Sequence, residues 1–225
     1  ICGTVFFLCN PLTLPFSILG VIGLATYTHF KRRWWGGPFW NSWVVALLPI
    51  MGNLCVGFEL EKMLSSPQSL AIIGSVFFSY AIFVLLGYFK DVSADRATKY
   101  QTLPVVAGWK NSILVSGLFL VSTIGCDVLL WNSTDNSLKT FSFSLFTSLG
   151  LWLFGIFCLF FAHFLMWKSA KEEEAHFSIA YVVRGYVLIH SGESLFLAPS
   201  LLWFCFFFYA GFEVFLKARP VPSQI

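Results

Sequence analysis

The chain has 225 residues, of which 57% are hydrophobic and only 11% are charged, and its mean hydropathy is +0.77. Soluble domains carry about 25% charged residues, so this composition excludes an ordinary water-soluble globule. The formal net charge is only +3, and no Lys/Arg tract interleaves with aromatic residues. A nucleic-acid partner is therefore not expected.

Long apolar runs follow one another along the chain and set its expected architecture. A membrane-spanning helix needs about 20 mostly apolar residues. In chain order the sequence predicts a stub at 1–9 and spans at 11–28, 41–58, 69–89, 111–131, 141–166 and 195–216. The runs are continuous rather than alternating, which favours helices over a barrel. We expect an all-α, polytopic transmembrane bundle that forms a single domain over 1–225.

The amino-terminal stub indicates that the sequence is a fragment. The chain starts at Ile1 rather than Met, and the residues up to Cys9 are already apolar. A basic n-region and a small-residue cleavage site are both lacking, so the stub does not resemble a signal peptide. We interpret it as the end of a helix that begins upstream.

One segment is ambiguous because it combines apolar residues with a charge. Residues 178–190 contain Arg184 and His190, and the pattern fits a half-helix, a span or a helix lying in the membrane interface. Ionisable groups inside a membrane are candidates for function. Asp127 and His163 lie nearer the ends of their runs, where an interfacial position is expected.

The basic residues of the connecting loops predict the orientation of the chain. Three loops, 29–40, 90–110 and 167–177, contain nine of them: Lys31, Arg32, Arg33, Lys90, Arg96, Lys99, Lys110, Lys168 and Lys171. The loops between them contain only Lys62 and Lys139. By the positive-inside rule the three basic loops are cytoplasmic. We expect an integral protein of a bacterial or archaeal cytoplasmic membrane.

Two carboxylates spaced four residues apart follow the run 69–89. On a continuing helix, Asp91 and Asp95 would share one face, where a divalent cation would relieve their repulsion. Mg²⁺ takes one or two protein carboxylates and completes its coordination with waters and substrate phosphates. A DxxxD pattern by itself is also typical of a solvated loop in which acids and bases pair.

The residues around the two aspartates make the pattern more specific. The string KDVSADRATKYQTLPVVAG (90–108) resembles the second aspartate-rich motif of the UbiA superfamily of intramembrane prenyltransferases. The carboxylate pair, the arginine, the TLP and the later glycine all match in register. Upstream, YTHFKRRWWGGPFWN (27–41) resembles the Tyr…Lys-Arg loop of that family, and the helix pattern extends the resemblance over most of the chain.

The resemblance implies a site and a cofactor. Members have nine transmembrane helices around a central cavity, with two aspartate-rich cytoplasmic loops that bind the diphosphate of a polyprenyl donor through Mg²⁺. Carried over by position, Asp91 and Asp95 would be the metal ligands and catalytic acids. The basic residues that would contact the diphosphate are Lys31, Arg32 and Arg33 and, more weakly, Lys90 and Arg96.

This sequence departs from the family pattern at three places. The first motif, of the type NDxxDxxxD, is missing, and would lie upstream of Ile1 with the first two helices of the nine-helix fold. Two spans and their loops correspond to roughly 60 or more residues. Lys99 stands where glycine is common, and the loop RRWWGGPFWN is longer than usual, which leaves the matching basic residue open.

The activity that the resemblance implies is Mg²⁺-dependent transfer of a prenyl group to an aromatic or lipid acceptor within the bilayer. The acceptor classes left open are a quinone precursor, a lipid glycerol phosphate and a tetrapyrrole. The family also contains terpene cyclases, which lack a second substrate. A transporter or channel is a further alternative, for which charges near mid-span would be expected. A non-catalytic membrane fragment is the last.

Overall fold

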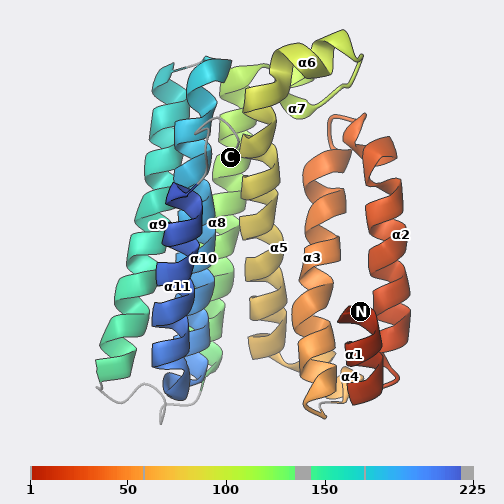
Figure 1. The fold of residues 1–225 in the computed structure, drawn as a ribbon, viewed down its shortest axis with the longest axis vertical. Helices are drawn as coiled ribbons and strands as arrows, with labels where there is room; N and C mark the ends of the chain where they lie inside the picture. The colour runs from red at the N-terminus through yellow and green to blue at the C-terminus, as the bar shows by residue number, and fades with distance from the viewer. Residues whose placement is uncertain (1, 58, 135–142, 170, 219–225) are drawn as a thin grey trace. The chain divides into compact units, whose positions relative to one another are not determined.

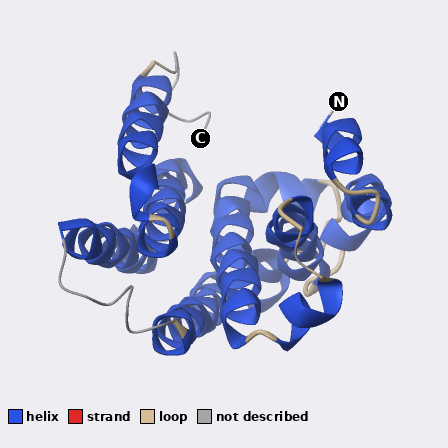
Figure 2. Cartoon of the chain, turned by 90° about the horizontal axis from the view of Figure 1, so that it is seen from below, coloured by secondary structure: helices blue, strands red, loops and turns tan. Residues whose placement is uncertain are grey.

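The computed structural model describes residues 2–57, 59–134, 143–169 and 171–218. Every regular element in those ranges is helical, as Figure 2 shows. The expected all-α fold class is therefore confirmed. Of the features expected from the sequence, Ile1 of the stub, residue 58, Lys139 and residues 141–142 lie outside the described ranges.

The chain divides into two compact units, Ile1–Ser133 and Thr134–Ile225. The helices of the first unit are α1 (Cys2–Cys9), α2 (Thr13–Lys31), α3 (Gly36–Cys55), α4 (Leu60–Ser65), α5 (Pro67–Gly87), α6 (Val92–Ala97), α7 (Leu103–Ala107) and α8 (Trp109–Ser133). Four long helices pack in sequence, with α3 against α2, α5 against α3 and α8 against α5 (Figure 1). The expectation that residues 1–225 form a single transmembrane domain stays a prediction.

Helix α5 is the centre of the first unit, and its ends are set by local sequence. The side chain of Ser66 caps the helix by accepting a hydrogen bond from Ser69 N at 3.3 Å, and Pro67 occupies the first turn. At the other end the chain tightens into η1 (Tyr88–Asp91), a 3₁₀ turn that leads directly into α6. Gly108, with φ +79°, separates α7 from α8.

The second unit is built on a helical hairpin. It contains α9 (Phe143–Ser169), η3 (Glu172–Glu174), α10 (Ala175–Leu197), η4 (Pro199–Leu201) and α11 (Leu202–Lys217). Small residues recur every seven positions on the facing sides of α9 and α10, and all six are buried. This small-residue seam consists of Ser148, Gly155 and Ala162 on α9 and Ser178, Gly185 and Gly192 on α10.

The seam lets two antiparallel backbones approach closely. A Cβ on Gly185 would lie 2.8 Å from Leu159 Cδ2 and 2.9 Å from the carbonyl oxygen of Gly155. Ser148 Oγ donates a 2.8 Å hydrogen bond to the carbonyl oxygen of Gly192. Small residues at helix contacts and polar bonds between helices are what packing in lipid requires, because there is no hydrophobic drive between helices.

The carboxy-terminal helices differ from two expectations. Residues 178–190 are the middle of α10, a continuous 23-residue helix, so the half-helix interpretation was wrong. The span expected at 195–216 is interrupted, because residues 195–197 finish α10 and α11 begins only at Leu202. The break follows from Ala198, which is extended at φ −137° and ψ 82°, and from Pro199, which lacks a backbone donor.

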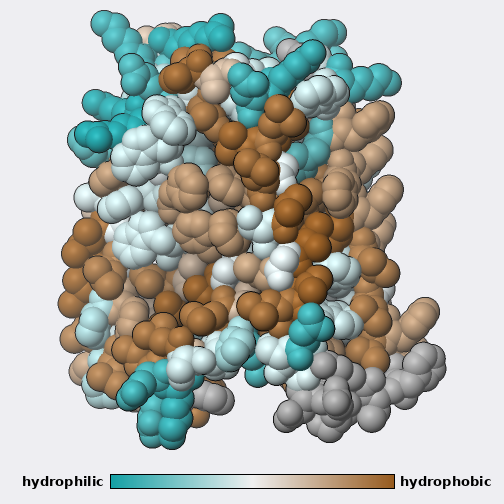
Figure 3. Space-filling model, turned by 180° about the vertical axis from the view of Figure 1, so that it is seen from behind, coloured by the Kyte–Doolittle hydropathy of each residue, from teal (hydrophilic) through white to brown (hydrophobic). Residues whose placement is uncertain are grey.

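Five helical segments are long and apolar enough to cross a membrane: Thr13–Lys31, Pro67–Ala97, Trp109–Ser133, Phe143–Ser169 and Pro199–Lys217. Helices α3 and α10, of 20 and 23 residues, have sufficient length but are not among the five. On the face seen in Figure 3, hydrophobic side chains cover the middle of the helices and hydrophilic ones gather at their ends. That distribution is typical of a protein embedded in lipid.

Candidate functional site

The two segments that carry the sequence motifs meet at one end of the first unit. Figure 1 shows α6 and α7 beyond the end of α5, near the turn between α2 and α3. A backbone hydrogen bond joins the segments, from Gln101 N to the carbonyl oxygen of Arg32 at 3.1 Å. The structure therefore brings together the two motif segments, which the sequence analysis could place only on the same side of the membrane.

Asp95 is the buried centre of this region. Its first carboxylate oxygen, Oδ1, lies 3.3 Å from Lys31 Nζ at the end of α2. Its second oxygen, Oδ2, accepts a 3.0 Å hydrogen bond from Thr102 Oγ1. Asp95 is 3% exposed, so its charge is stabilised by these two partners rather than by bulk water.

Tyrosine rings enclose the ammonium group of Lys31. Its Nζ lies 5.2 Å from the ring centroid of Tyr88 and 5.4 Å from that of Tyr100. The Tyr88 hydroxyl shares a 2.9 Å hydrogen bond with the hydroxyl of Tyr27, one turn before Lys31 on α2. Ring faces attract a cation within about 6 Å, so the rings hold the ammonium group in place.

Helix α3 begins against the same tyrosine. A Cβ on Gly37 would overlap the hydroxyl of Tyr88, so only glycine fits at this position. Gly36, Gly37 and Pro38, the start of α3, are all buried.

Lys99 occupies the backbone conformation that glycine normally supplies. Its φ is +60°, and among the described residues it is the only one other than glycine with a positive φ. The left-handed turn ends α6 and lets Tyr100 N return to the carbonyl oxygen of Asp95 at 2.8 Å. The glycine common in the family at this position is thus explained by backbone geometry.

Asp91 differs from Asp95 in its surroundings. It is half-buried at the junction of η1 and α6, with φ −121° and ψ 13°. Within the described ranges it makes neither an ion pair nor a side-chain hydrogen bond. The two aspartates expected to act as a pair therefore have different roles in this structure: Asp95 is fully engaged, and Asp91 is available to a ligand.

The other basic residues proposed from the sequence are more exposed. The Arg32 guanidinium lies 5.3 Å from the ring centroid of Tyr100 and so belongs to the same cluster. Arg33, Lys90 and Arg96 are exposed, and no contact with Asp95 is observed for them in the described part of the chain. Of the five basic residues predicted to meet a diphosphate, Lys31 and Arg32 are the two that the structure brings together.

Sequence reasoning assigned no role to Tyr27, Tyr88 or Thr102. Tyr27 and Thr102 were inside the two quoted motifs, and Tyr88 stands three residues before Asp91. The signal was their spacing from the charged residues: Tyr27 lies one helical turn from Lys31. Their contacts, however, join residues far apart in sequence, which no local pattern reveals.

The carboxylate oxygens of this cluster are ligands of the kind that a hard cation prefers, but there are few of them. Among the described residues, no group of three or more His, Cys, Asp or Glu side chains could hold a metal ion. Mg²⁺ needs only one or two carboxylates when a phosphate substrate supplies further oxygens. Asp91 fits that requirement, whereas Asp95 fits it only if Lys31 gives up its contact.

The remaining ionisable candidates belong to the long helices α8, α9 and α10. Asp127, expected at the interface, is fully buried in α8. His163 Nδ1 lies 2.7 Å from the carbonyl oxygen of Leu159, one turn earlier on α9. His190 Nδ1 lies 2.6 Å from Glu193 Oε2. These contacts are of the kind that satisfies polar groups within a helical unit.

Arg184 forms a second ion pair, which the sequence did not predict. Its Nε and Nη2 atoms donate to the two carboxylate oxygens of Glu213 on α11, at 2.6 and 3.0 Å. Tyr209 donates a 2.9 Å hydrogen bond to Glu213 Oε1. Because α11 buries only Cys205 and Leu216, this pair is its main attachment to α10.

The comparisons with known proteins agree with the motifs. The family model described as UbiA prenyltransferase family matches residues 1–182. The search of curated proteins gave no match, and neither did the search of solved structures.

Proposed function

Since the chain belongs to the UbiA prenyltransferase family, we propose that this integral membrane protein transfers a prenyl group from a polyprenyl diphosphate to a hydrophobic acceptor. The observation that carries the proposal is the Lys31–Asp95 pair, which joins the two family motifs in one cluster. A cation held against a buried carboxylate, between tyrosine rings, is a preorganised site for a multiply charged anion.

The donor's diphosphate is the anion that this cluster suits. Lys31 Nζ and the Arg32 guanidinium lie 5.4 and 5.3 Å from the ring centroid of Tyr100, so both cations are close to the same ring. Lys31 is in position to leave Asp95 for the oxygens of an arriving diphosphate. Arg33, Lys90 and Arg96, on the same two motif segments, are exposed and would attract the donor over a longer range.

The carboxylates are proposed to hold the metal. Asp91 would supply one ligand without breaking any contact, and Asp95 would supply the second after Lys31 has moved. Bound Mg²⁺ would neutralise the charge that develops on the leaving diphosphate. The Tyr88 and Tyr100 rings, freed of Lys31, would then face the allylic cation with an attraction of order 0.5–2 kcal/mol per well-placed ring.

The acceptor class is left to assay. An aromatic ring, a lipid hydroxyl and a tetrapyrrole would each reach the donor from the hydrophobic side, and a cyclase would need none. The transporter alternative expected charges near mid-span, and Arg184 is such a charge. However, its bidentate pairing with Glu213 occupies the donors that a transport pathway would use, which favours the transferase.

The proposal is tested by Asp91→Ala in the full-length protein. Turnover of a polyprenyl diphosphate at saturating Mg²⁺ should fall by at least 10²–10³-fold, as is typical when one charge-stabilising group is lost. The thermal midpoint should stay unchanged because Asp91 has no ion pair among the described residues. Asp95→Ala should lose the same activity and also some stability.

The matched control is Glu61→Ala, which removes an exposed acid from α4. It should retain both turnover and stability. Full activity in the two aspartate variants would reject the assigned roles.

A further inference from the structure

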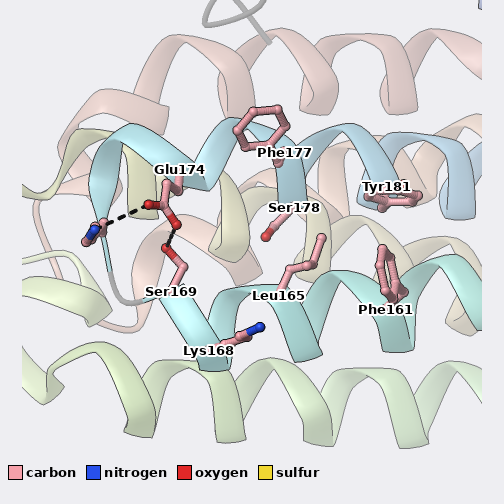
Figure 4. Close-up of a pocket in the computed structure, with 9 residues that line it drawn as sticks. Phe161, Leu165, Lys168, Ser169, Glu174, Phe177, Ser178 and Tyr181 are labelled. Carbon is pink, nitrogen blue, oxygen red and sulfur yellow. Dashed lines mark hydrogen bonds and ion pairs between the residues drawn. The ribbon is translucent and has the colours of Figure 1, made fainter.

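A groove lies on the hairpin of the second unit, at the end where α9 turns into α10. Its volume is about 560 Å³. The side chains that line it, most of them labelled in Figure 4, are Phe161, Leu165, Lys168, Ser169, Lys171, Glu174, Phe177, Ser178 and Tyr181. We call it the hairpin groove, and nothing in the transfer reaction described above uses it.

The residues that line the groove lie on one face of α9 and on one face of α10, so the groove runs along both helices. On α9 its residues recur at the spacing of one face, from Phe161 through Leu165 to Lys168. On α10 they do the same, from Phe177 and Ser178 to Tyr181, and Glu174 precedes the first turn of that helix. The floor is closed where the Phe161 and Tyr181 rings meet edge to face, with centroids 4.8 Å apart.

Cations stand at the mouth of the groove. Lys168 is exposed and has no ion pair among the described residues. Lys171 Nζ lies 3.4 Å from Glu174 Oε1 in a pair that is largely exposed and therefore weak. The hydrogen bond from Ser169 lowers the pKa of Glu174, and Lys171 adds to that effect. The mouth thus holds two cations and one anion that is ionised at neutral pH.

The polar mouth and the apolar floor are separated by a distance that matches the membrane interface. From Lys168 back to Phe161 is seven residues, or about 10 Å along a helix at 1.5 Å per residue. Trp167, beside Lys168, is 45% exposed, and Trp at such a position is typical of the headgroup level. Phe161, Leu165 and Tyr181 therefore lie at the depth of acyl chains.

We propose that the hairpin groove binds one anionic phospholipid, with the headgroup phosphate on Lys168 and Lys171 and an acyl chain on Leu165, Phe161 and Tyr181. Charge complementarity selects an anionic headgroup over a zwitterionic one. The apolar floor selects a lipid over a soluble phosphate, which would leave Leu165 and the aromatic rings exposed to water.

The test measures lipid retention by native mass spectrometry. The full-length protein is released from micelles that contain phosphatidylglycerol or phosphatidylcholine of equal chain length. The protein should retain phosphatidylglycerol about tenfold more tightly. Lys168→Gln/Lys171→Gln should abolish that difference, because a basic residue near a lipid headgroup contributes about 1 kcal/mol and 1.4 kcal/mol is a factor of ten.

The matched control is Lys62→Gln/Lys217→Gln, which removes the same net charge from two exposed lysines outside the groove. It should keep the preference for phosphatidylglycerol. An equal loss in this control would show that net charge alone is responsible and would overturn the site.

A variant that is expected to strengthen lipid retention keeps the test decisive if the lysine variants fold poorly. Glu174→Gln removes the anion at the mouth and frees Lys171, so retention of phosphatidylglycerol should rise a few-fold. Unchanged or weaker retention would contradict the proposal.

A last comparison distinguishes the source of the phosphate. Millimolar inorganic phosphate should not displace the bound lipid, and Leu165→Asn should weaken retention of both lipids. Displacement by phosphate would identify a soluble-anion site and overturn the lipid assignment, and so would equal retention of the two lipids by the unmodified protein.

Discussion

Each of the two units of this protein contains an ion pair that is mostly shielded from water, and the two pairs differ in what surrounds them. Lys31 and Asp95 are 20% and 5% exposed in their side chains, and Arg184 and Glu213 are 23% and 21% exposed. The first pair has one contact between charged atoms. The second has two, and a tyrosine completes the hydrogen bonding of its carboxylate.

The difference supports the proposed site at the first pair and a structural role for the second. Arg32 contacts the same tyrosine ring as Lys31, Asp91 has no ion pair among the described residues, and the proposal requires Lys31 to exchange one anion for another. The Arg184–Glu213 pair is saturated and joins two helices, which a bidentate guanidinium does with fixed geometry. The two cations are almost equally exposed, so the neighbouring groups and the burial of the carboxylates distinguish the pairs.

Lys31→Met should produce the largest effect and should affect both activity and stability. Turnover should fall by 10²–10³-fold, as for the loss of one charge-stabilising group. Stability should also fall by about 1–3 kcal/mol, because Asp95 remains buried without its cation. An activity assay with a polyprenyl diphosphate measures turnover, and a denaturation curve measures stability. Lys31→Arg should restore most of the stability, and normal turnover in the Met variant would remove this pair from the site.

Glu213→Ala should affect stability alone. Loss of one partner of a buried pair costs about 3–5 kcal/mol, and the partial exposure of this pair favours the lower end. Turnover per folded molecule should be unchanged. Arg184→Met/Glu213→Leu should recover the stability, since apolar residues of similar volume replace such pairs well. Lost turnover in the well-folded double variant would show that the pair belongs to the chemistry after all.

Lys99→Gly should have the smallest effect and the opposite sign. A left-handed conformation costs a residue other than glycine about 1–2 kcal/mol, part of which glycine loses again in chain entropy. A gain of about 0.5–1 kcal/mol is expected in the free energy of unfolding, which a denaturation curve measures. Ala97→Gly, in the helical turn just before, should instead lower it. The contrast would locate the strained backbone at Lys99 rather than in the helical turn before it.

Continuous apolar runs made the long helices predictable from the sequence, and the family resemblance named Asp91, Asp95 and Lys31 among the candidate site residues, whose roles stay predictions. Long-range partners were not predictable. Arg184 made 178–190 ambiguous because its partner Glu213 is 29 residues away and belongs to another helix. The difference between the two aspartates was also not predictable, because it depends on the contact of Lys31 with Asp95 and not on the four-residue spacing.

The small-residue seam of the second unit has a consequence for natural variation. Even the Cβ of an alanine at Gly185 would collide with the facing backbone, while Gly150 on the same hairpin has open space around it. The inner faces of α9 and α10 should therefore tolerate almost no change among descendants of this chain. The outer face of α9, where Phe154, Phe157 and Phe160 are more than half exposed, should drift freely among apolar residues.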